Sequence, residues 1–305
     1  MNAALTRDTV CVEDNTLLIM PVEEQAMAFD CAGDSLIGVL SGVALSSRRG
    51  VLIVVGGPQY RVGSHRQFTL LARHLAERGV PTLRFDYRGK GDSDGEVRTF
   101  ERVGADIRCA IDRFFASVPE LKDVVLWGLC DAASAALFYA RRDARVSGLV
   151  LLNPWVRTEQ GIARMHLRHY YVRRLFQASL WQKVSRGQFK FREAAAALGK
   201  FVFQAMGRGS SSGTIEASSA SVAPLPDRME DALRRFQGRV LFILSGNDLT
   251  AQEFKDAVAR SRRWRRLLTD DRVTRYDLPE ANHTFARRDW RNQVERWTEA
   301  WVKSL

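Results

Sequence analysis

The sequence lacks any hydrophobic run long enough to cross a bilayer. No stretch of its 305 residues approaches the roughly 18 to 20 consecutive apolar residues that a membrane-spanning helix needs. The first 16 residues mix charged and small side chains and contain no apolar core of a secretory signal. We therefore expect a protein of the cytoplasm.

Cysteine is also scarce, and no Cys-x-x-Cys pair is present. The four cysteines are Cys11, Cys31, Cys109 and Cys130. In a chain expected in the cytoplasm, this wide spacing argues against a disulfide framework and against a structural zinc site. We interpret Cys31 and Cys109 as small apolar residues of the core. We expect no bound metal and no cofactor.

Acidic residues are outnumbered: 46 Lys and Arg against 35 Asp and Glu give a formal net charge of +11. Such a charge suits nucleic acid, an anionic membrane surface or an acidic substrate. The arginines recur along the whole chain, however, and no zinc finger, RNA-binding aromatic motif or basic zipper is present. We therefore interpret the charge as a solvated arginine-rich surface and expect no nucleic-acid partner.

Short apolar runs alternate with helical patterns along most of the chain. The run 51–55 is continuous and β-branched, which is typical of a strand buried on both faces. The alternation predicts βαβ crossovers and an α/β fold: a mostly parallel sheet with helices on both faces. Expected strands lie at 17–20, 35–40, 51–55, 81–85, 123–127, 146–152, 239–245 and 273–278. Expected helices lie at 67–78, 100–117, 131–141, 251–263 and 287–304.

The alternation is interrupted in the middle of the chain. Residues 155–203 have a helical composition dense in arginine and aromatic residues, and residues 207–226 are rich in Gly, Ser, Ala and Pro. We interpret 155–226 as a helical cap with a mobile loop, inserted between two parts of the core, 1–154 and 227–305. We favour an amphipathic lid; the alternative is an anion-binding or membrane-facing surface.

The segment most informative about chemistry is VVLWGLCDA, residues 124–132, in which a strand passes into a helix through Cys130. Gly128 and Ala132, two positions to either side, are small, as a tight turn requires. Such a turn holds the cysteine at a helix N-terminus, where the helix dipole and free N–H groups favour a thiolate. The segment resembles the nucleophile elbow of the α/β-hydrolase fold, with Cys where Ser is usual and Ala132 where a second Gly is usual.

This resemblance implies an acid and then a histidine after the nucleophile. Asp248 follows the expected strand 239–245, and His283 follows the expected strand 273–278, at the positions where the family places them. In a Cys–His–Asp triad the imidazole takes or shares the thiol proton, and the carboxylate fixes its tautomer. Taken alone, Asp248 has a simpler interpretation as a turn residue and His283 as a loop histidine.

An acyl-transfer enzyme also needs N–H donors for the developing oxyanion. The resemblance implies the backbone N–H of Asp131 as one donor and that of Gly57 as the other. Gln59 is the fallback, because Pro58 has no N–H. We also take Gln59 and His65 as candidate substrate-binding residues. The Gly-Gly-Pro segment has a simpler interpretation as a tight turn.

Two further segments carry a family resemblance. Residues 86–93, DYRGKGDS, resemble a loop that is structural in α/β-hydrolases, so we expect no catalytic role for it. Residues 56–68, GGPQYRVGSHRQF, together with the elbow look like hydrolase 1 of the exosortase A system, a bacterial subfamily encoded alongside protein-sorting and exopolysaccharide genes. The cysteine in the nucleophile position resembles dienelactone hydrolase. The resemblance implies a hydrolase or acyltransferase of envelope biosynthesis and names no substrate.

The choice of nucleophile narrows the reaction. A thiolate attacks esters, thioesters and lactones well, whereas amide cleavage needs protonation of a poor leaving group. We predict an ester or thioester hydrolase that acts on a small acyl compound through a covalent thioacyl-enzyme. Whether the substrate carries a phosphate or lipid link, and whether the cap contacts a membrane surface, are left open. Two alternatives remain: an acyltransferase on the same triad, and a catalytically silent protein that binds a partner through its arginine-rich cap.

Overall fold

The computed structural model describes residues 22–156 and 223–305. Cys11, the expected strand at 17–20 and nearly all of the expected cap lie outside the described residues. The division of the chain into two core parts and a cap therefore stays a prediction.

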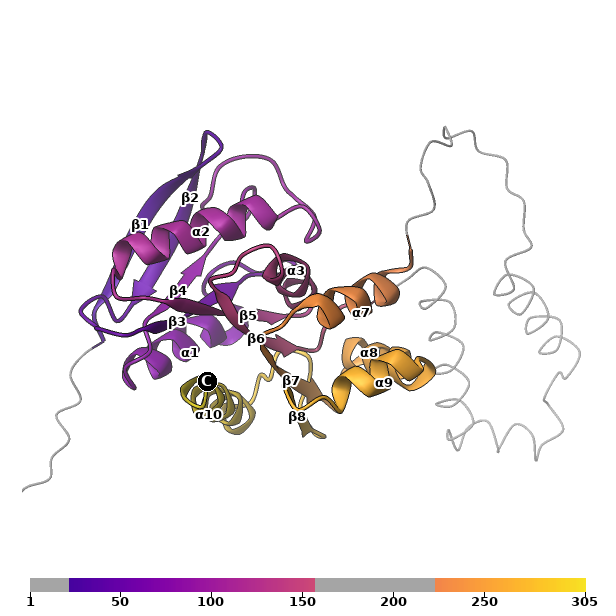
Figure 1. Ribbon diagram of the computed structural model, residues 1–305. Coiled ribbons are helices and arrows are strands. Elements are labelled where there is room, and N and C mark those ends of the chain that lie inside the picture. Colours follow the sequence, from indigo (N-terminus) through magenta and orange to yellow (C-terminus); the bar gives the residue numbers. More distant parts are fainter. Residues whose placement is uncertain (1–21, 157–222) are drawn as a thin grey trace, which may run out of the picture.

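A single eight-stranded sheet organises the described residues, in the order β1-β2-β4-β3-β5-β6-β7-β8 (Figure 1). The strands are β1 Glu24–Cys31, β2 Asp34–Ser41, β3 Arg49–Val54, β4 Thr82–Phe85, β5 Asp123–Leu129, β6 Val146–Leu152, β7 Arg239–Ser245 and β8 Val273–Leu278. β2 pairs antiparallel with β1 and with β4, and all other pairs are parallel. The predicted mostly parallel sheet is confirmed.

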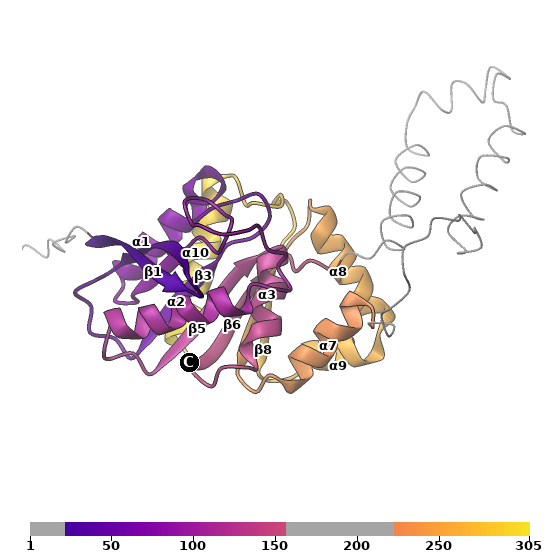
Figure 2. The ribbon, with the colours of Figure 1, turned by 90° about the horizontal axis from the view of Figure 1, so that it is seen from above.

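Helices cover both faces of the sheet. They are α1 Gln67–Ala76, α2 Gly104–Ser117, α3 Asp131–Ala140, α7 Leu225–Arg235, α8 Leu249–Arg260, α9 Arg262–Leu268 and α10 Arg288–Lys303, with a 3-10 turn at Ser64–Arg66. α2 and α3 lie on one face, α1 and α10 on the other, and α7 to α9 gather at the β7–β8 end (Figures 1 and 2). This layering follows from right-handed βαβ crossovers.

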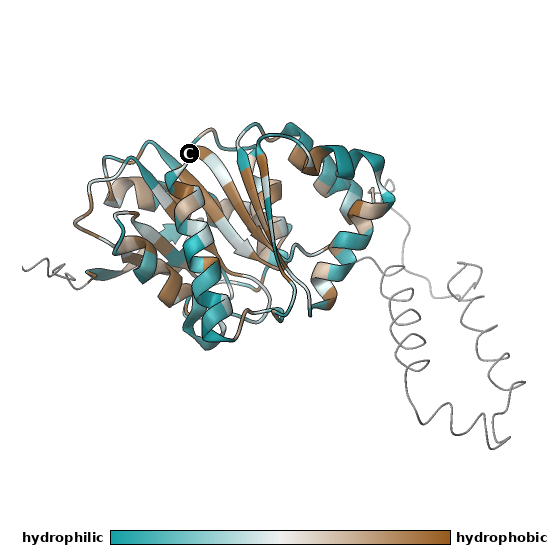
Figure 3. Ribbon diagram, turned by 90° about the horizontal axis from the view of Figure 1, so that it is seen from below, coloured by the Kyte–Doolittle hydropathy of each residue, from teal (hydrophilic) through white to brown (hydrophobic). Residues whose placement is uncertain are grey.

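The central strands form the core because both of their faces are covered. All side chains from Val51 to Val54 on β3 and from Val124 to Leu126 on β5 are fully buried. Figure 3 shows the apolar strands beneath helices whose outer faces are hydrophilic. Continuous apolar runs are therefore needed here, as in other sheets covered on both sides.

Three elements differ from the sequence prediction. β1 was not predicted; it is an edge strand whose exposed positions are Gln25, Ala26, Ala28 and Asp30, so it lacks the continuous apolar run that marks the inner strands. α7 was not predicted either; it begins inside the expected loop and buries Met229 and Leu233. The expected helix 251–263 is two helices, because Ser261 is extended and its side chain caps α9 by accepting the N–H of Trp264.

Candidate active site

Cys130 occupies a strained turn between β5 and α3. Its φ of 64° and ψ of −126° lie in a region that non-glycine residues rarely adopt. A Cβ on Gly128 would lie 2.7 Å from the backbone of Ala132, so only glycine fits before the nucleophile position. The turn leaves Cys130 partly exposed at the N-terminus of α3. Strain at this position, between a strand and a helix, is the geometry of a nucleophile elbow.

Ala132 departs from the glycine usual in the elbow, and the structure shows how the extra methyl group is accommodated. Gly56, at the end of β3, lies directly opposite, and a Cβ on Gly56 would be 2.9 Å from the Cβ of Ala132. The gap between these two residues thus has room for one Cβ, and Ala132 fills it because residue 56 is glycine.

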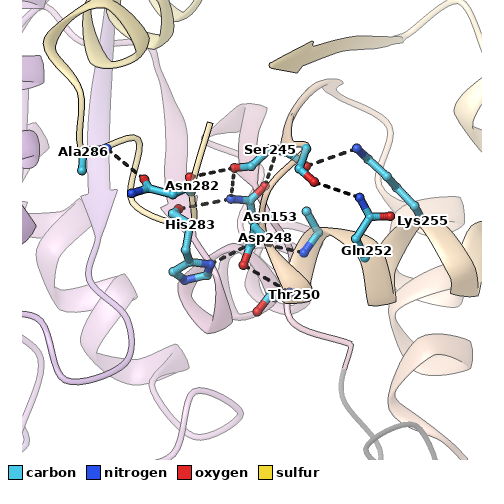
Figure 4. Close-up of polar contacts among 11 residues, drawn as sticks. Asn153, Ser245, Asp248, Thr250, Gln252, Lys255, Asn282, His283 and Ala286 are labelled. Atoms are coloured by element: carbon cyan, nitrogen blue, oxygen red, sulfur yellow. Dashed lines mark hydrogen bonds and ion pairs between the residues drawn. The ribbon is translucent and has the colours of Figure 1, made fainter. Parts of the chain in front are cut away.

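Asp248 lies at the N-terminus of α8, in the loop after β7. Its carboxylate accepts the backbone N–H of Thr250 (3.3 Å) and Ala251 (3.1 Å), and its Oδ2 lies 3.0 Å from Nδ1 of His283 (Figure 4). Burial opposes the charge of Asp248, but the hydrogen bond with His283 and the two N–H groups outweigh it, and the pKa is lowered. Asp248 is therefore a fixed anion beside the imidazole.

His283 joins the other two residues. Hydrogen bonds with Asp248 and then with Cys130 raise its pKa from 6.5 to about 10, while burial acts in the opposite direction. The structure thus brings Cys130, Asp248 and His283 together from three loops at the carboxyl edge of the sheet. An imidazole held protonated between a carboxylate and a thiol can stabilise a thiolate and later donate a proton.

A buried amide missed from the sequence holds the histidine loop in place. Asn153, directly after β6, donates from Nδ2 to the Ser245 hydroxyl (2.7 Å) and to the His283 carbonyl (3.2 Å), and its Oδ1 accepts the Ser245 N–H (2.9 Å) (Figure 4). The Ser245 hydroxyl donates to the carbonyl of Asn282 (3.0 Å). The sequence signal that could have identified Asn153 is an Asn-Pro pair at the end of a strand. The backbone of Asn153 has a φ of 43°, a left-handed conformation that asparagine tolerates.

The two loop N–H groups considered as oxyanion donors are both engaged. The N–H of Gly57 donates to Oδ2 of Asp131 (3.0 Å), and the N–H of Gln59 donates to the carbonyl of Gly56 (3.2 Å). Nζ of Lys90 donates to the carbonyl of Gly57 (2.9 Å) and fixes the same turn from its other side. Either N–H group could therefore bind an oxyanion only after it releases its present acceptor, Asp131 for Gly57 or the Gly56 carbonyl for Gln59.

The residues expected to bind substrate lie in the loop between β3 and α1. Oε1 of Gln59 accepts the N–H of Ser64 (3.3 Å) and Nε2 of Gln67 (3.2 Å), so its amide braces the loop. His65 is exposed and has a left-handed backbone with φ 53°, as does Arg66 with φ 61°. Their contact with substrate stays a prediction.

The loop at residues 86–93 is held by buried ion pairs. Asp86 is fully buried and accepts the N–H of Arg61 (2.6 Å) as well as its guanidinium, and Arg88 pairs with Asp106 at 2.7 Å. These contacts fit the expected structural role. Lys90 is the member of this loop that reaches the Gly57 turn.

Across residues 22–156 and 223–305, His, Cys, Asp and Glu nowhere gather in a group of three or more that could hold a metal ion. None of the helices in these two ranges is both long and apolar enough to span a bilayer.

The sheet order, the strained elbow and the convergence of three loops define an α/β-hydrolase fold. A family model described as serine aminopeptidase, S33, matches residues 46–197. No curated protein matches the chain in sequence. The fold is therefore that of the α/β-hydrolases, and the family match supports a hydrolase.

Solved structures agree with this fold. An esterase of Pyrococcus furiosus, Pf2001, superposes with a TM-score of 0.62 at 14% identity, covering 93% of this chain and 91% of its own. Est1E of Butyrivibrio proteoclasticus, solved with ferulic acid, gives 0.59 at 16% identity, with coverage of 92% and 98%. Dienelactone hydrolase of Anabaena variabilis gives 0.57 at 15% identity, with coverage of 93% and 99%.

Proposed function

We propose that the protein hydrolyses an ester or thioester through Cys130, His283 and Asp248. The observation that carries the proposal is the 3.0 Å contact between His283 and Asp248, beside a cysteine at a nucleophile elbow that helps to raise the pKa of His283. The esterases and the dienelactone hydrolase among the structural neighbours share this fold and are consistent with acyl-transfer chemistry.

The reaction has two halves. The thiolate of Cys130 attacks the acyl carbon, a C–S bond forms, and His283 donates its proton to the departing alkoxide or thiolate. In the second half, His283 takes a proton from water, the hydroxide attacks the thioacyl carbon, and the carboxylic acid leaves as the thiolate is restored. Asp248 keeps Nδ1 of His283 hydrogen-bonded, so that Nε2 faces the sulfur in both halves.

The substrate class follows from the nucleophile. A thiolate is itself a good leaving group, so a tetrahedral intermediate formed on an amide returns to reactants unless the amine is protonated first. Esters and thioesters are free of this restriction. We therefore propose esters and thioesters ahead of peptide bonds as substrates, because a peptide bond would need His283 to protonate the amine before the Cys130 thiolate departs.

The biological setting is proposed from the sequence resemblance alone. Hydrolase 1 of the exosortase A system is associated with envelope biosynthesis, so we propose an acyl compound of exopolysaccharide metabolism as substrate. This compound carries either a phosphate or a lipid link. We propose that the enzyme acts in the cytoplasm with residues 155–226 as its cap.

Intact-mass spectrometry tests the proposal. The full-length protein is incubated with p-nitrophenyl acetate, a panel of p-nitrophenyl esters and an acyl-CoA thioester, and the adduct is located by peptide mapping. We expect one acyl group on Cys130, lost over time with release of the acid, and no adduct in Cys130→Ala. Unchanged turnover in Cys130→Ala removes this residue from the reaction. Transfer to an added sugar hydroxyl in place of water assigns an acyltransferase.

A further inference from the structure

The carboxylate of Asp131, the residue after the nucleophile, lies against the turn that supplies the proposed second oxyanion donor. Its Oδ2 accepts the N–H of Gly57 at 3.0 Å. Its Oδ1 is buried. Burial raises the pKa of this carboxyl, whereas the backbone N–H groups of Gly57, Ala132 and Asp131 act in the opposite direction. A Cβ on Gly56 would lie 2.2 Å from Oδ1, so the carboxylate packs directly on the backbone of the turn.

The N–H of Gly57 therefore has two possible acceptors, the Asp131 carboxylate and the oxyanion of the substrate. A backbone N–H aimed at a carboxylate is unavailable to an oxyanion until that hydrogen bond is released. The neighbouring turn offers no substitute, since Pro58 has no N–H and that of Gln59 is bonded to the Gly56 carbonyl. A carboxylate this close to the turn also repels the negative charge that develops on the acyl oxygen.

We propose that the Asp131 side chain holds the Gly57 N–H in the resting enzyme and limits the rate of acylation of Cys130 until it releases that donor. The inference rests on the proposed function, because it concerns the same thioacyl-enzyme. It adds a rate-setting role for the Asp131 carboxylate that is separate from the role of its backbone N–H.

A simpler role for the same side chain makes different predictions. Asp131 is the first residue of α3, where a carboxylate stabilises the helix dipole. If that were its whole role, its removal would lower stability and leave the chemistry of the oxyanion unchanged. Two reactions of the same sulfur separate these roles. Alkylation of Cys130 by iodoacetamide forms no oxyanion, whereas acylation by p-nitrophenyl acetate does.

The experiment measures both rate constants in the wild type, Asp131→Asn and Asp131→Ala, with Cys130→Ala as the blank. We expect the ratio of acylation to alkylation to rise about tenfold or more in Asp131→Ala. A smaller rise is expected in Asp131→Asn, whose amide oxygen still accepts the Gly57 N–H without the charge. Because the ratio compares one folded population with itself, a change in stability or in thiolate content does not imitate this result.

A ratio that is unchanged or lower in Asp131→Ala overturns the proposal. It leaves the proposed function standing as long as both reactions need Cys130. Acylation that persists in the Cys130→Ala blank instead contradicts the proposed function itself, so the two failures are distinguishable.

A second observation, away from the active site, concerns two cysteines. The Sγ atoms of Cys31, at the end of β1, and Cys109, on α2, lie 2.8 Å apart. Cys31 is buried in the core, as predicted, whereas Cys109 is partly exposed and packs against the core. The contact between their sulfurs was not predicted, because 78 positions separate them in the sequence.

We infer that Cys31 and Cys109 are a site of reversible disulfide formation with a peroxide as oxidant. The partly exposed Cys109 reacts first: its thiolate attacks a peroxide oxygen and becomes a sulfenic acid as hydroxide leaves. The sulfur of Cys31 then attacks the Cys109 sulfur, the S–S bond forms, and water leaves with the Cys31 proton. Two thiols and one hydrogen peroxide thus give one disulfide and two waters. Burial and the neighbouring sulfur raise the pKa of Cys31 to about 12, which assigns it the second step.

Hydrogen peroxide titration of the full chain tests this inference, read by non-reducing peptide mapping and melting temperature. We expect a Cys31–Cys109 peptide that dithiothreitol removes, together with a higher melting temperature, because the bond ties the β1–β2 hairpin to α2. Cys31→Ser and Cys109→Ser must each abolish both changes. Stepwise oxidation of Cys109 to the sulfinic acid without the linked peptide overturns the inference.

Discussion

Nδ1 of His283 and Oδ2 of Asp248 lie 3.0 Å apart, although 35 positions separate the two residues. The contact joins the loop after β8 to the loop after β7, and it sets the charge of the imidazole that faces Cys130. The chemistry of the site therefore depends on how accurately neighbouring loops are held at one edge of the sheet.

Replacement of Asp248 by Asn tests this contact. Asn keeps the size of the side chain but loses the charge that fixes the imidazole tautomer, so we expect kcat/KM for an ester to fall by about a hundredfold or more. Asp289→Asn is the matched control, since Asp289 is an exposed carboxylate paired with Arg287. Equal losses in both variants would contradict a special role for Asp248.

Replacement of Cys130 by Gly tests the strain at the elbow. Glycine adopts a φ of 64° readily, so we expect unfolding in urea to require about 1 kcal/mol more free energy than in the wild type while acylation is lost. Cys130→Ala removes the sulfur but keeps a Cβ, so it should lose acylation without that gain. If the two variants are equally stable, the turn stores no strain of this size.

Stability should depend on pH through His283. Its pKa is raised to about 10 in the folded protein, from 6.5. The stabilisation is fully present below about pH 6.5, where both states carry the proton. It is lost as pH rises toward about 10, because the unfolded chain releases its proton first. Denaturant unfolding from about pH 6 to about pH 10.5 should show this decline, and His283→Gln should flatten it.

Asn153 should act on catalysis through the position of His283. Asn153→Ala leaves the Ser245 N–H and hydroxyl without their buried partner, and we expect a loss of about 2 to 3 kcal/mol in unfolding free energy. Asn153→Asp keeps the acceptor for the Ser245 N–H but loses both donated hydrogen bonds. We expect this second variant to show a lower kcat with KM nearly unchanged. A changed KM with normal kcat would instead place residue 153 in substrate binding.

Local pattern was sufficient for much of the fold and for the order of the site residues. The β-branched runs of β3 and β5 predicted strands buried on both faces, and the small residues Gly128 and Ala132 predicted a tight turn around Cys130. Asp248 and His283 were found through the resemblance to α/β-hydrolases, which implies an acid and then a histidine after the nucleophile. They converge in space because the carboxyl ends of parallel strands meet at one edge of the sheet.

Edge elements and long-range contacts were beyond the sequence pattern. β1 is half exposed, and its outer face mixes alanine with charged residues, so its sequence has no continuous apolar run and its pairing with β2 defines it as a strand. Nothing in the sequence indicated that the side chain of Asp131 contacts Gly57, because 74 positions separate the two residues. Only the backbone N–H of Asp131 was expected to take part in the site. The sequence by itself determined the alternation, the elbow and the chemical types at the three loop positions, since these depend on neighbours along the chain. The tertiary structure decided which hydrogen bonds those groups make, because the partners come from different strands and meet only when the sheet is assembled.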